Sequence, residues 1–425
     1  MPGPLVMESV IVFGDSLSDI GRKWTTKAGK AAIAFNEMFV SPTGRYSDCR
    51  NWTDFMIEEA TGKSLVSGTA SDTIERSKHH INLSKRSMLF SDADQFHPFQ
   101  YANYAEGGAC GDTPHSKKAF LGTFKEQIDW FEEDLRLTEL PLGNTLFIVW
   151  FGANDLYTAE RPAAEMHLVA EAVANTQRNR LLSIVRKQHC ACRFVFVNLA
   201  RALTSVRYTK QLNDATTALK GILPTDQATL AKARASKLWH AQKTLNLAAA
   251  NNKTAGRFSG DGRKVKELQE KVAMVKNFEV GVMNYNTHLA LKTRGNADGL
   301  AEVGNIISEE TLNRLFEGNF HLMAGALGAR TSVHTDSAHY DTTQVRPVTT
   351  VDEVHPTDQM YKVIWDEIYA EIKRCNATFG LLTGARAATT LATLAGPSAT
   401  VRGDFNSIMA DIQKGGFALR KTGLR

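Results

Sequence analysis

The sequence predicts an α/β fold with a doubly wound, mostly parallel sheet flanked by helices. Three short apolar runs, rich in β-branched and aromatic residues, stand at Glu8–Phe13, Leu146–Phe151 and Arg193–Leu199. Helix-like segments separate these runs, and uninterrupted apolar strands that alternate with helices are typical of a parallel sheet covered on both faces. The first two runs stop at Gly14 and Gly152, so each of these strands is expected to end in a turn.

Helices are expected between the strands and near the end of the chain. Asn51–Ala60 and Phe124–Leu135 precede the second strand, and Ala163–Lys187 lies between the second and the third. Another helix is expected after Pro356, because proline suits the first turn of a helix. Its buried stripe is marked by apolar residues at four-residue spacing, namely Met360, Ile364, Ile368 and Ile372.

The composition is that of a folded globular protein. Of the 425 residues, 43% are hydrophobic and 22% charged, which excludes a wholly disordered, collagen-like or disulfide-knotted chain. No run of about 18 apolar residues occurs, so an integral membrane helix is not expected. The net charge of +5 is weak evidence for nucleic acid, which is not expected as a partner. The five cysteines lack zinc-ligand spacing and are interpreted as reduced thiols.

The segment from about 210 to 280 differs from the rest of the chain in its charge. Between 210 and 279 there are 13 Lys or Arg against 6 Asp or Glu, an excess of +7. Many Ala, Leu, Lys and Gln residues favour helix there, so we interpret it as a basic helical insertion. It is either a solvated helical face or a surface for a membrane or a partner. We expect one domain over 1–375 that includes it, and an Ala/Thr/Gly-rich tail or docked helix over 376–425.

The first strand ends in Gly14-Asp15-Ser16-Leu17, which suits nucleophilic catalysis. Serine is a weak nucleophile unless a base removes its proton and donors stabilise the developing oxyanion. A glycine turn between a strand and a helix exposes the hydroxyl of Ser16 and directs backbone N–H groups to the same place. Taken alone, Ser16 is as consistent with a helix cap as with a nucleophile.

A base and a carboxylate stand near the other end of the chain, in the segment 351–357 (VDEVHPT). Asp352 and His355 are three positions apart, so a helical turn or a tight bend places both side chains on one face. The carboxylate can then fix the imidazole tautomer and stabilise the imidazolium formed during proton transfer. The alternative is a His–Asp surface pair beside a helix start.

Two further segments offer hydrogen-bond donors for an oxyanion. Asn103–Ala109 (NYAEGGA) contains the glycine doublet Gly107-Gly108, which allows a backbone amide to approach a substrate closely. The segment 152–155 (GAND) places the amide of Asn154 at a strand end. A backbone N–H and an Asn amide are the donors that an oxyanion hole needs, although a glycine turn and an Asn cap explain each segment by itself.

These four segments occur in an order that resembles the sequence blocks of the GDSL, or SGNH, hydrolase family of esterases and lipases. The resemblance spans roughly residues 10 to 372. It implies that Ser16 is the nucleophile, that His355 is the general base and then the acid, and that Asp352 orients His355. This mechanism needs neither a metal nor another cofactor, and the sequence shows no metal-ligand spacing.

The resemblance also implies an oxyanion hole. Its donors would be the backbone amide of Ser16, Gly108 and Asn154, with Gly107 as the alternative to Gly108 within the doublet. The segment Gly44-Arg45-Tyr46-Ser47, followed by Asn51-Trp52, resembles more loosely the bacterial phospholipase and glycerophospholipid:cholesterol acyltransferase branch.

The implied reaction is ester hydrolysis through an acyl-enzyme on Ser16. Phospholipids or other lipid esters are the expected substrates, and an alcohol that replaces water would make the protein an acyltransferase. A carbohydrate O-acetylesterase is the alternative within the same chemistry. A non-catalytic host-interaction module on a hydrolase scaffold is the alternative from another class of protein.

The location of the protein is inferred from its first residues. Met1–Val10 lacks the basic region, the apolar core and the cleavage site of a secretory signal. We therefore expect a protein that is cytoplasmic as synthesised, or a bacterial effector exported by a route other than Sec. Peripheral membrane contact through the basic insertion is a further expectation, and the sequence leaves the oligomeric state open.

Overall fold

The structure is a computed structural model, and its description is confined to part of the chain. The described residues are 5–27, 29, 44–47, 49–61, 65–66, 100–112, 121–138, 142–200, 208, 261–293, 299–302, 354–356, 358–375 and 377–379. Asp352, most of the predicted basic insertion and the tail from 380 onward lie outside these ranges. None of the helices within them combines the length and the apolar character that a membrane span requires.

A five-stranded sheet forms the centre of the fold, with its strands in the order β3-β2-β4-β5-β6. All four pairings between neighbouring strands are parallel. The three predicted runs become its longest strands, and every residue of β2 and β4 is buried, as in a sheet covered on both faces. The bounds are β2 Ser9–Gly14, β3 Gln100–Asn103, β4 Thr145–Trp150, β5 Cys192–Val197 and β6 Gly299–Ala301.

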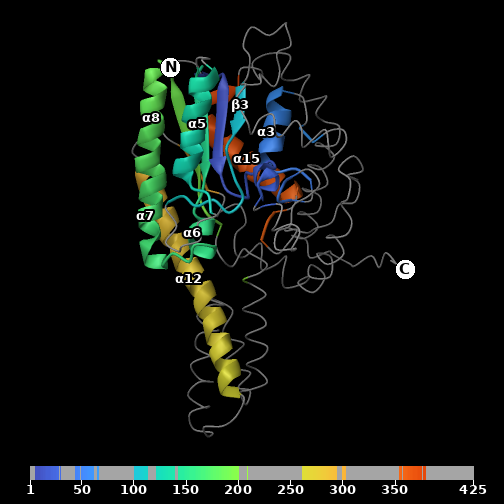
Figure 1. Ribbon diagram of the computed structural model, residues 1–425, viewed down its shortest axis with the longest axis vertical. Helices are drawn as coiled ribbons and strands as arrows, with labels where there is room; N and C mark the ends of the chain where they lie inside the picture. Colours follow the sequence, from blue (N-terminus) through green and yellow to red (C-terminus); the bar gives the residue numbers. More distant parts are fainter. Residues whose placement is uncertain are drawn as a thin grey trace, which may run out of the picture.

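Helices cover both faces of this sheet, which confirms the predicted doubly wound α/β fold. In Figure 1, α5, α7 and α8 lie on one side of the strands, and α3 and α15 lie on the other. The predicted helix over 163–187 is one run in which a 3₁₀ turn, α7, a π-helical turn and α8 follow one another. The bounds are α3 Trp52–Thr61, α5 Phe124–Thr138, η1 Ala163–Glu165, α7 Met166–Glu171, η2 Ala172–Gln177, α8 Arg178–Lys187 and α15 Asp358–Arg374.

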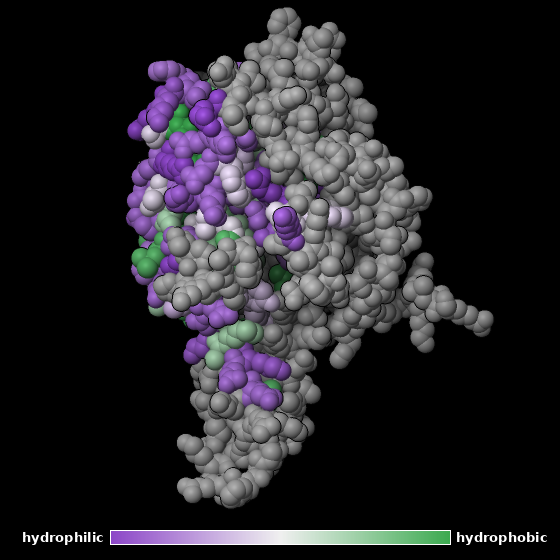
Figure 2. All heavy atoms as spheres, in the orientation of Figure 1, coloured by the Kyte–Doolittle hydropathy of each residue, from purple (hydrophilic) through white to green (hydrophobic). Residues whose placement is uncertain are grey.

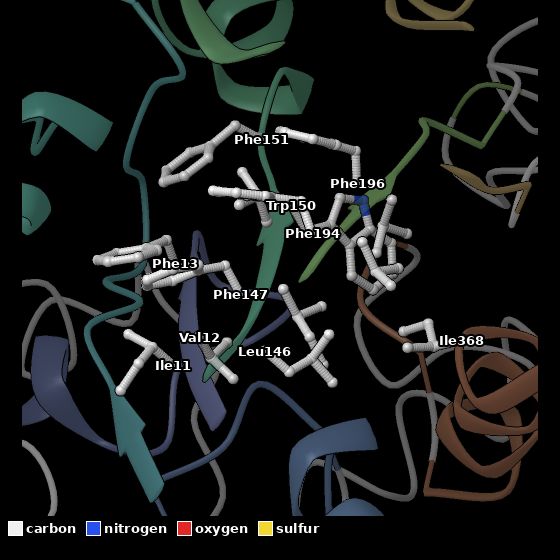
Figure 3. Close-up of a cluster of buried hydrophobic side chains, with 14 of the residues drawn as sticks. Ile11, Val12, Phe13, Leu146, Phe147, Trp150, Phe151, Phe194, Phe196 and Ile368 are labelled. Carbon is white, nitrogen blue, oxygen red and sulfur yellow. The ribbon is translucent and has the colours of Figure 1, made fainter. Parts of the chain in front are cut away.

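Aromatic side chains from successive strands pack together on the face covered by α5 and α8 (Figure 3). The ring of Phe147 on β4 stacks on Phe13 of β2 at 6.2 Å and on Phe194 of β5 at 5.0 Å. On the opposite face, α15 buries its predicted stripe, from Met360 at 7% exposure to Ile372 at 0%. Both faces therefore hold the strands firmly, so the residues at the strand ends are attached to a rigid support.

Two short strands form a second, smaller parallel sheet. β1 (Leu5–Met7) pairs with β7 (Ala377–Phe379), so the chain just after Cys375 joins the chain just before β2. The sequence predicted neither strand, because three-residue strands carry too few apolar residues to stand out. All five cysteines lie in the described ranges, and each of them is a free thiol.

The long helix α12 (Asp261–Thr293) begins inside the predicted basic insertion and continues past its expected end near 280. Its C-terminal half packs against α7, with Val282, Tyr285 and Leu289 buried. Its N-terminal half projects away from the sheet (Figure 1). Asn286 donates to the carbonyl of Leu199 at 2.8 Å and accepts from its N–H at 2.8 Å, so α12 fixes the turn after β5. The predicted domain limits stay a prediction.

The surface that Figure 2 shows is mostly hydrophilic over the described helices, with scattered apolar side chains. Among the described side chains of α12, the large apolar residues that are exposed are Met274, Val280, Met283 and Leu291. Isolated apolar residues of this kind are common on solvent-exposed protein surfaces and do not by themselves indicate a binding site.

The strand order places a topological switch point between β2 and β4. Numbered within this sheet alone, the strands lie in the order 2-1-3-4-5. The chain runs from β2 to β3 on one side of β2 and then crosses to β4 on the other side. Ligands of open parallel sheets bind beyond the carboxyl ends of the strands at such a point. Gly14 pairs with Trp150 at the ends of β2 and β4, so the segments that carry Ser16 and Asn154 begin side by side.

Candidate active site

Ser16 and His355 form a hydrogen-bonded pair although 339 positions separate them. The distance from His355 Nε2 to Ser16 Oγ is 2.8 Å, and both residues are partly buried. Ser16 follows β2 directly, and His355 lies just before α15. A hydroxyl within hydrogen-bond reach of an imidazole nitrogen has the geometry of a nucleophile and its base. Asp352, the predicted partner of His355, lies outside the described residues, so its role stays a prediction.

The turn that carries Ser16 is held from both sides. Asp15 accepts from the N–H of Leu17 through its Oδ1 at 3.0 Å and from the N–H of Ser18 through its carbonyl at 3.1 Å. The buried amide of Gln127 on α5 accepts from the N–H of Gly14 at 3.0 Å and donates to its carbonyl at 2.8 Å. The backbone before and after Ser16 is therefore fixed by hydrogen bonds that do not use the backbone N–H of Ser16.

A second carboxylate joins this turn to the glycine doublet. Buried Asp19 accepts from three backbone N–H groups of its own turn, and it accepts from the N–H of Gly107 at 2.8 Å. Burial raises the pKa of Asp19 to about 6, while the four N–H groups oppose that rise. Because the N–H of Gly107 is occupied in this way, the two glycines of the doublet are not equivalent.

Gly108 differs from Gly107 in the hydrogen bonding of its backbone amide. Its N–H donates to no acceptor within the described ranges, and its φ of +85° lies in the left-handed region that glycine adopts without strain. The same holds for the N–H of Ser16, which meets no acceptor among the described residues. The structure thus favours Gly108, and not Gly107, as the donor that the doublet offers to a ligand.

The side chain of Asn154 lies beside Asp15. It follows β4 in the short helix α6 (Ala153–Tyr157), and its Nδ2 donates to Asp15 Oδ2 at 3.1 Å. Its Oδ1 accepts from the hydroxyl of Thr158 at 2.9 Å. The other N–H of this amide has no acceptor in the part of the chain that the structure describes. Ser16, Gly108 and Asn154 therefore stand beyond the ends of three adjacent strands, and each has one N–H that meets no acceptor among the described residues.

Two buried aspartates shape the surroundings of these donors. Burial raises the pKa of Asp15 to about 7, against the lowering effects of the Leu17 N–H and of nearby His355. Burial likewise raises the pKa of Asp155 to about 6. Asp155 accepts from the N–H groups of Gly111 and Asp112 at 2.8 and 3.2 Å, so it anchors the loop that follows the glycine doublet.

Tyr46 occupies the space between His355 and Gly107. Its ring centroid is 4.9 Å from that of His355, and a Cβ placed on Gly107 would lie only 2.0 Å from its hydroxyl oxygen. The segment that carries Tyr46 is held by neighbouring Arg45, which is fully buried and donates to Asp54 at 3.0 and 2.6 Å. Tyr46 thus supports the imidazole on one side and the glycine doublet on the other.

The sequence reasoning did not single out most of these supporting residues. Asp15 and Asp19 flank Ser16, and an aspartate in a turn directly after a buried strand is a signal of a structural hydrogen-bond acceptor. Gln127 gave a similar signal, since it is a polar residue on the apolar face of a predicted helix. Tyr46 gave none beyond its place in the segment 44–47. Within the described residues, no three His, Cys, Asp or Glu side chains are grouped so that they could hold a metal ion.

Comparisons with known proteins identify the family of this chain. Residues 10–368 match the family described as GDSL-like Lipase/Acylhydrolase, a range that includes Ser16, Gly108, Asn154 and His355. The chain is also 25% identical over 169 residues to the GDSL esterase/lipase EXL3 of Arabidopsis thaliana. That alignment covers 37% of this chain and 41% of the plant protein. Since the family match spans most of the sequence, the chain belongs to the GDSL-like lipase and acylhydrolase family, whose members are esterase- and lipase-type hydrolases.

Proposed function

We propose that the protein is a serine esterase that cleaves carboxylic esters through an acyl-enzyme on Ser16. The observation that carries this proposal is the distance of 2.8 Å between Ser16 Oγ and His355 Nε2. An imidazole at that distance can remove the hydroxyl proton as the oxygen attacks, which turns a weak nucleophile into a strong one.

The first half of the reaction acylates Ser16. Its Oγ attacks the carbonyl carbon of the ester while His355 Nε2 takes the hydroxyl proton. The carbonyl oxygen becomes an oxyanion, which accepts from the N–H groups of Ser16, Gly108 and Asn154. The bond to the alcohol then breaks, and the alcohol leaves with the proton from His355.

The second half releases the acyl group. A water molecule gives a proton to His355 and attacks the acyl carbonyl, and the same three N–H groups stabilise the second oxyanion. The bond to Ser16 Oγ breaks, Oγ regains its proton from His355, and the carboxylic acid leaves. An alcohol in place of water would give acyl transfer. Asp352 is proposed to orient the imidazole throughout.

We propose lipid esters, and phospholipids among them, as the substrates. Membership of a lipase and acylhydrolase family supports this class of substrate. The excess of +7 between 210 and 279, with 13 basic against 6 acidic residues, supports peripheral contact with an anionic membrane surface. Such contact would bring an ester at the lipid–water boundary to Ser16.

The test of this proposal is the Ser16→Ala variant, assayed with esters of increasing acyl length and with phospholipid vesicles. Its turnover should fall by about 10³-fold or more, because the variant lacks the nucleophile. Ser18→Ala is the matched control, since the hydroxyl of Ser18 accepts from Trp52 Nε1 at 3.1 Å and does not contact His355. Ser18→Ala should retain ester turnover at a temperature where it is folded.

The outcomes separate the competing functions. Undiminished turnover in Ser16→Ala would show that Ser16 is not the nucleophile. Turnover of acetyl esters without turnover of ten-carbon esters would favour a carbohydrate O-acetylesterase over a lipase. A folded wild-type protein that turns over no ester and resists a fluorophosphonate probe would favour the non-catalytic alternative.

A further inference from the structure

The orientation of the Asn154 amide matters because an amide group has two unlike ends. Its NH₂ end donates hydrogen bonds and its oxygen only accepts, so a rotation of 180° would replace a donor by an acceptor. An oxyanion needs the donor, and an amide in the wrong orientation would repel it. The surroundings of Asn154 must therefore distinguish between the two orientations.

Asp15 provides that distinction. An ionised carboxylate only accepts hydrogen bonds, so the group beside Asp15 Oδ2 must be the NH₂ end of Asn154, at 3.1 Å. The other oxygen of Asp15 accepts from the N–H of Leu17 at 3.0 Å. Asp15 is 1% exposed, so water does not readily replace either partner. One carboxylate thus joins the turn of Ser16 to the side chain of Asn154.

Thr158 holds the amide from its other side, at the oxygen end. Its hydroxyl donates to Asn154 Oδ1 at 2.9 Å, and its backbone N–H donates to the carbonyl of Asn154 at 3.0 Å. A hydroxyl can accept as well as donate, so Asp15 selects the orientation of the amide, and the bond from Thr158 stabilises that orientation. The second N–H of Asn154 donates to neither Asp15 nor Thr158 in this arrangement.

We propose that Asp15 and Thr158 are positioning residues that orient the amide of Asn154 for the oxyanion formed at Ser16. The proposal rests on the proposed function, because it assigns no chemistry to either residue beyond that of the esterase. Asp15 has a second effect in this arrangement: the same carboxylate that orients the donor also fixes the turn of the nucleophile, so the two move together.

The orienting effect of Asp15 depends on its charge. Protonated Asp15 can donate as well as accept, so it no longer excludes the wrong amide orientation. Burial raises the pKa of Asp15 to about 7; His355 and the N–H groups of Leu17 and Asn154 favour its ionised form, whereas Asp155 opposes it. Among the described residues, Cys110 and Tyr285 also face Asp15: burial raises the pKa of each, and the charges of Asp155 and Asp15 add to that rise. Because Asp15 is ionised at about pH 8.5, kcat should be measured at that pH.

The central variant is Asp15→Asn, which keeps the shape of the side chain. An amide has one accepting end, so it can accept from Leu17 or from Asn154 but not from both. Outright removal of an oxyanion-hole donor lowers kcat by about 10²–10³-fold, so a misoriented donor should lower it by about 10- to 100-fold. KM should change by less than about threefold, because the lost interaction is made mainly in the transition state.

Thr158 offers a second variant that leaves the turn of Ser16 untouched. Thr158→Val keeps the shape and removes the hydroxyl, so it should also lower kcat with little effect on KM. Thr158→Ser keeps the hydroxyl and should restore most of the lost kcat. Equal kcat values for the Val and Ser variants would contradict the role of the hydroxyl. Thermal unfolding of each variant checks that it is folded under the assay conditions.

The decisive measurement is a double-mutant cycle between Asp15→Asn and Asn154→Ala. If Asp15 acts through Asn154, then Asp15→Asn should lower kcat by less than about threefold once Asn154 is already Ala. A full 10- to 100-fold loss in both backgrounds would mean that Asp15 acts independently of Asn154, and it would overturn the proposal. The Ser16→Ala assay separates this failure from a failure of the esterase function itself.

Discussion

Replacement of Gly107 by alanine should damage the site although it adds a single methyl group. A Cβ at Gly107 would lie 2.0 Å from Oη, 2.5 Å from Cζ and 2.9 Å from Cε2 of Tyr46. The hydroxyl of Tyr46 must therefore move by about 1 Å to reach even a tight contact. Tyr46 is 4% exposed and packs on His355 with 4.9 Å between ring centroids, so its displacement should reach the imidazole.

The magnitude follows from these distances. An added methyl group in a close-packed site costs about 1–3 kcal/mol of folding free energy. A misplacement of a catalytic group by about 1 Å lowers the rate by about 10²-fold. Gly107→Ala should therefore lower the free energy of unfolding by about 1–3 kcal/mol. It should lower kcat by about 10²-fold. The bond from the Gly107 N–H to Asp19 is not the cause, because alanine retains that N–H.

The assay combines urea denaturation with steady-state kinetics. Gly122→Ala is the matched control, because the nearest atom to a Cβ there lies at 3.6 Å, an ordinary contact. It should change stability by less than about 0.5 kcal/mol and leave kcat nearly unchanged. Tyr46→Ala removes the atoms that clash, so Gly107→Ala should cost little further kcat in that background. Wild-type kcat in Gly107→Ala, or equal losses in both backgrounds, would refute the reasoning.

Two further predictions concern stability. Arg45→Met removes the cation that donates to Asp54 at 3.0 and 2.6 Å, and both side chains are 0% exposed. The variant should lower the free energy of unfolding by about 3–5 kcal/mol, because it leaves the carboxylate of Asp54 buried without its partner. A urea midpoint equal to that of the wild type would contradict this prediction. Burial raises the pKa of Asp15 from 3.8 to about 7, and the pKa values of Asp19 and Asp155 to about 6. The folded chain therefore holds protons that the unfolded chain has released, and the free energy of unfolding should fall as pH rises from about 4 to about 7. Asp15 contributes up to about 4 kcal/mol of this fall, so Asp15→Asn should weaken the dependence of the free energy of unfolding on pH. If the free energy of unfolding of that variant falls with pH as steeply as that of the wild type, Asp15 is not the source of the fall.

Much of the fold could be predicted because its main strands are buried on both faces. Such strands appear in the sequence as continuous apolar runs, which is why β2, β4 and β5 were expected close to their observed bounds. The pairing of Ser16 with His355 was expected from the family resemblance, and not from any local pattern, because no sequence periodicity connects residues 339 positions apart.

What escaped prediction depends on contacts between distant segments. Gly108 was the predicted donor with Gly107 as the alternative, but the bond from Gly107 to Asp19 that separates the two glycines spans 88 positions and was not foreseen. The contact of Tyr46 with His355 likewise needs the folded chain to bring the segment 44–47 beside α15. The short strands β1, β6 and β7 have three residues each, too few for a recognisable pattern. Each of these features is a product of tertiary packing, on which local propensity has little influence.

The measurement that tests the central claim most directly is the mapping of the covalent adduct left by a fluorophosphonate probe. The wild-type protein should gain one probe mass on the peptide that contains Ser16, and His355→Ala should slow that labelling by about 10³-fold or more, since the base is lost. An adduct on a different serine, or a folded wild-type protein that hydrolyses esters and yet carries no adduct on Ser16, would contradict the assignment.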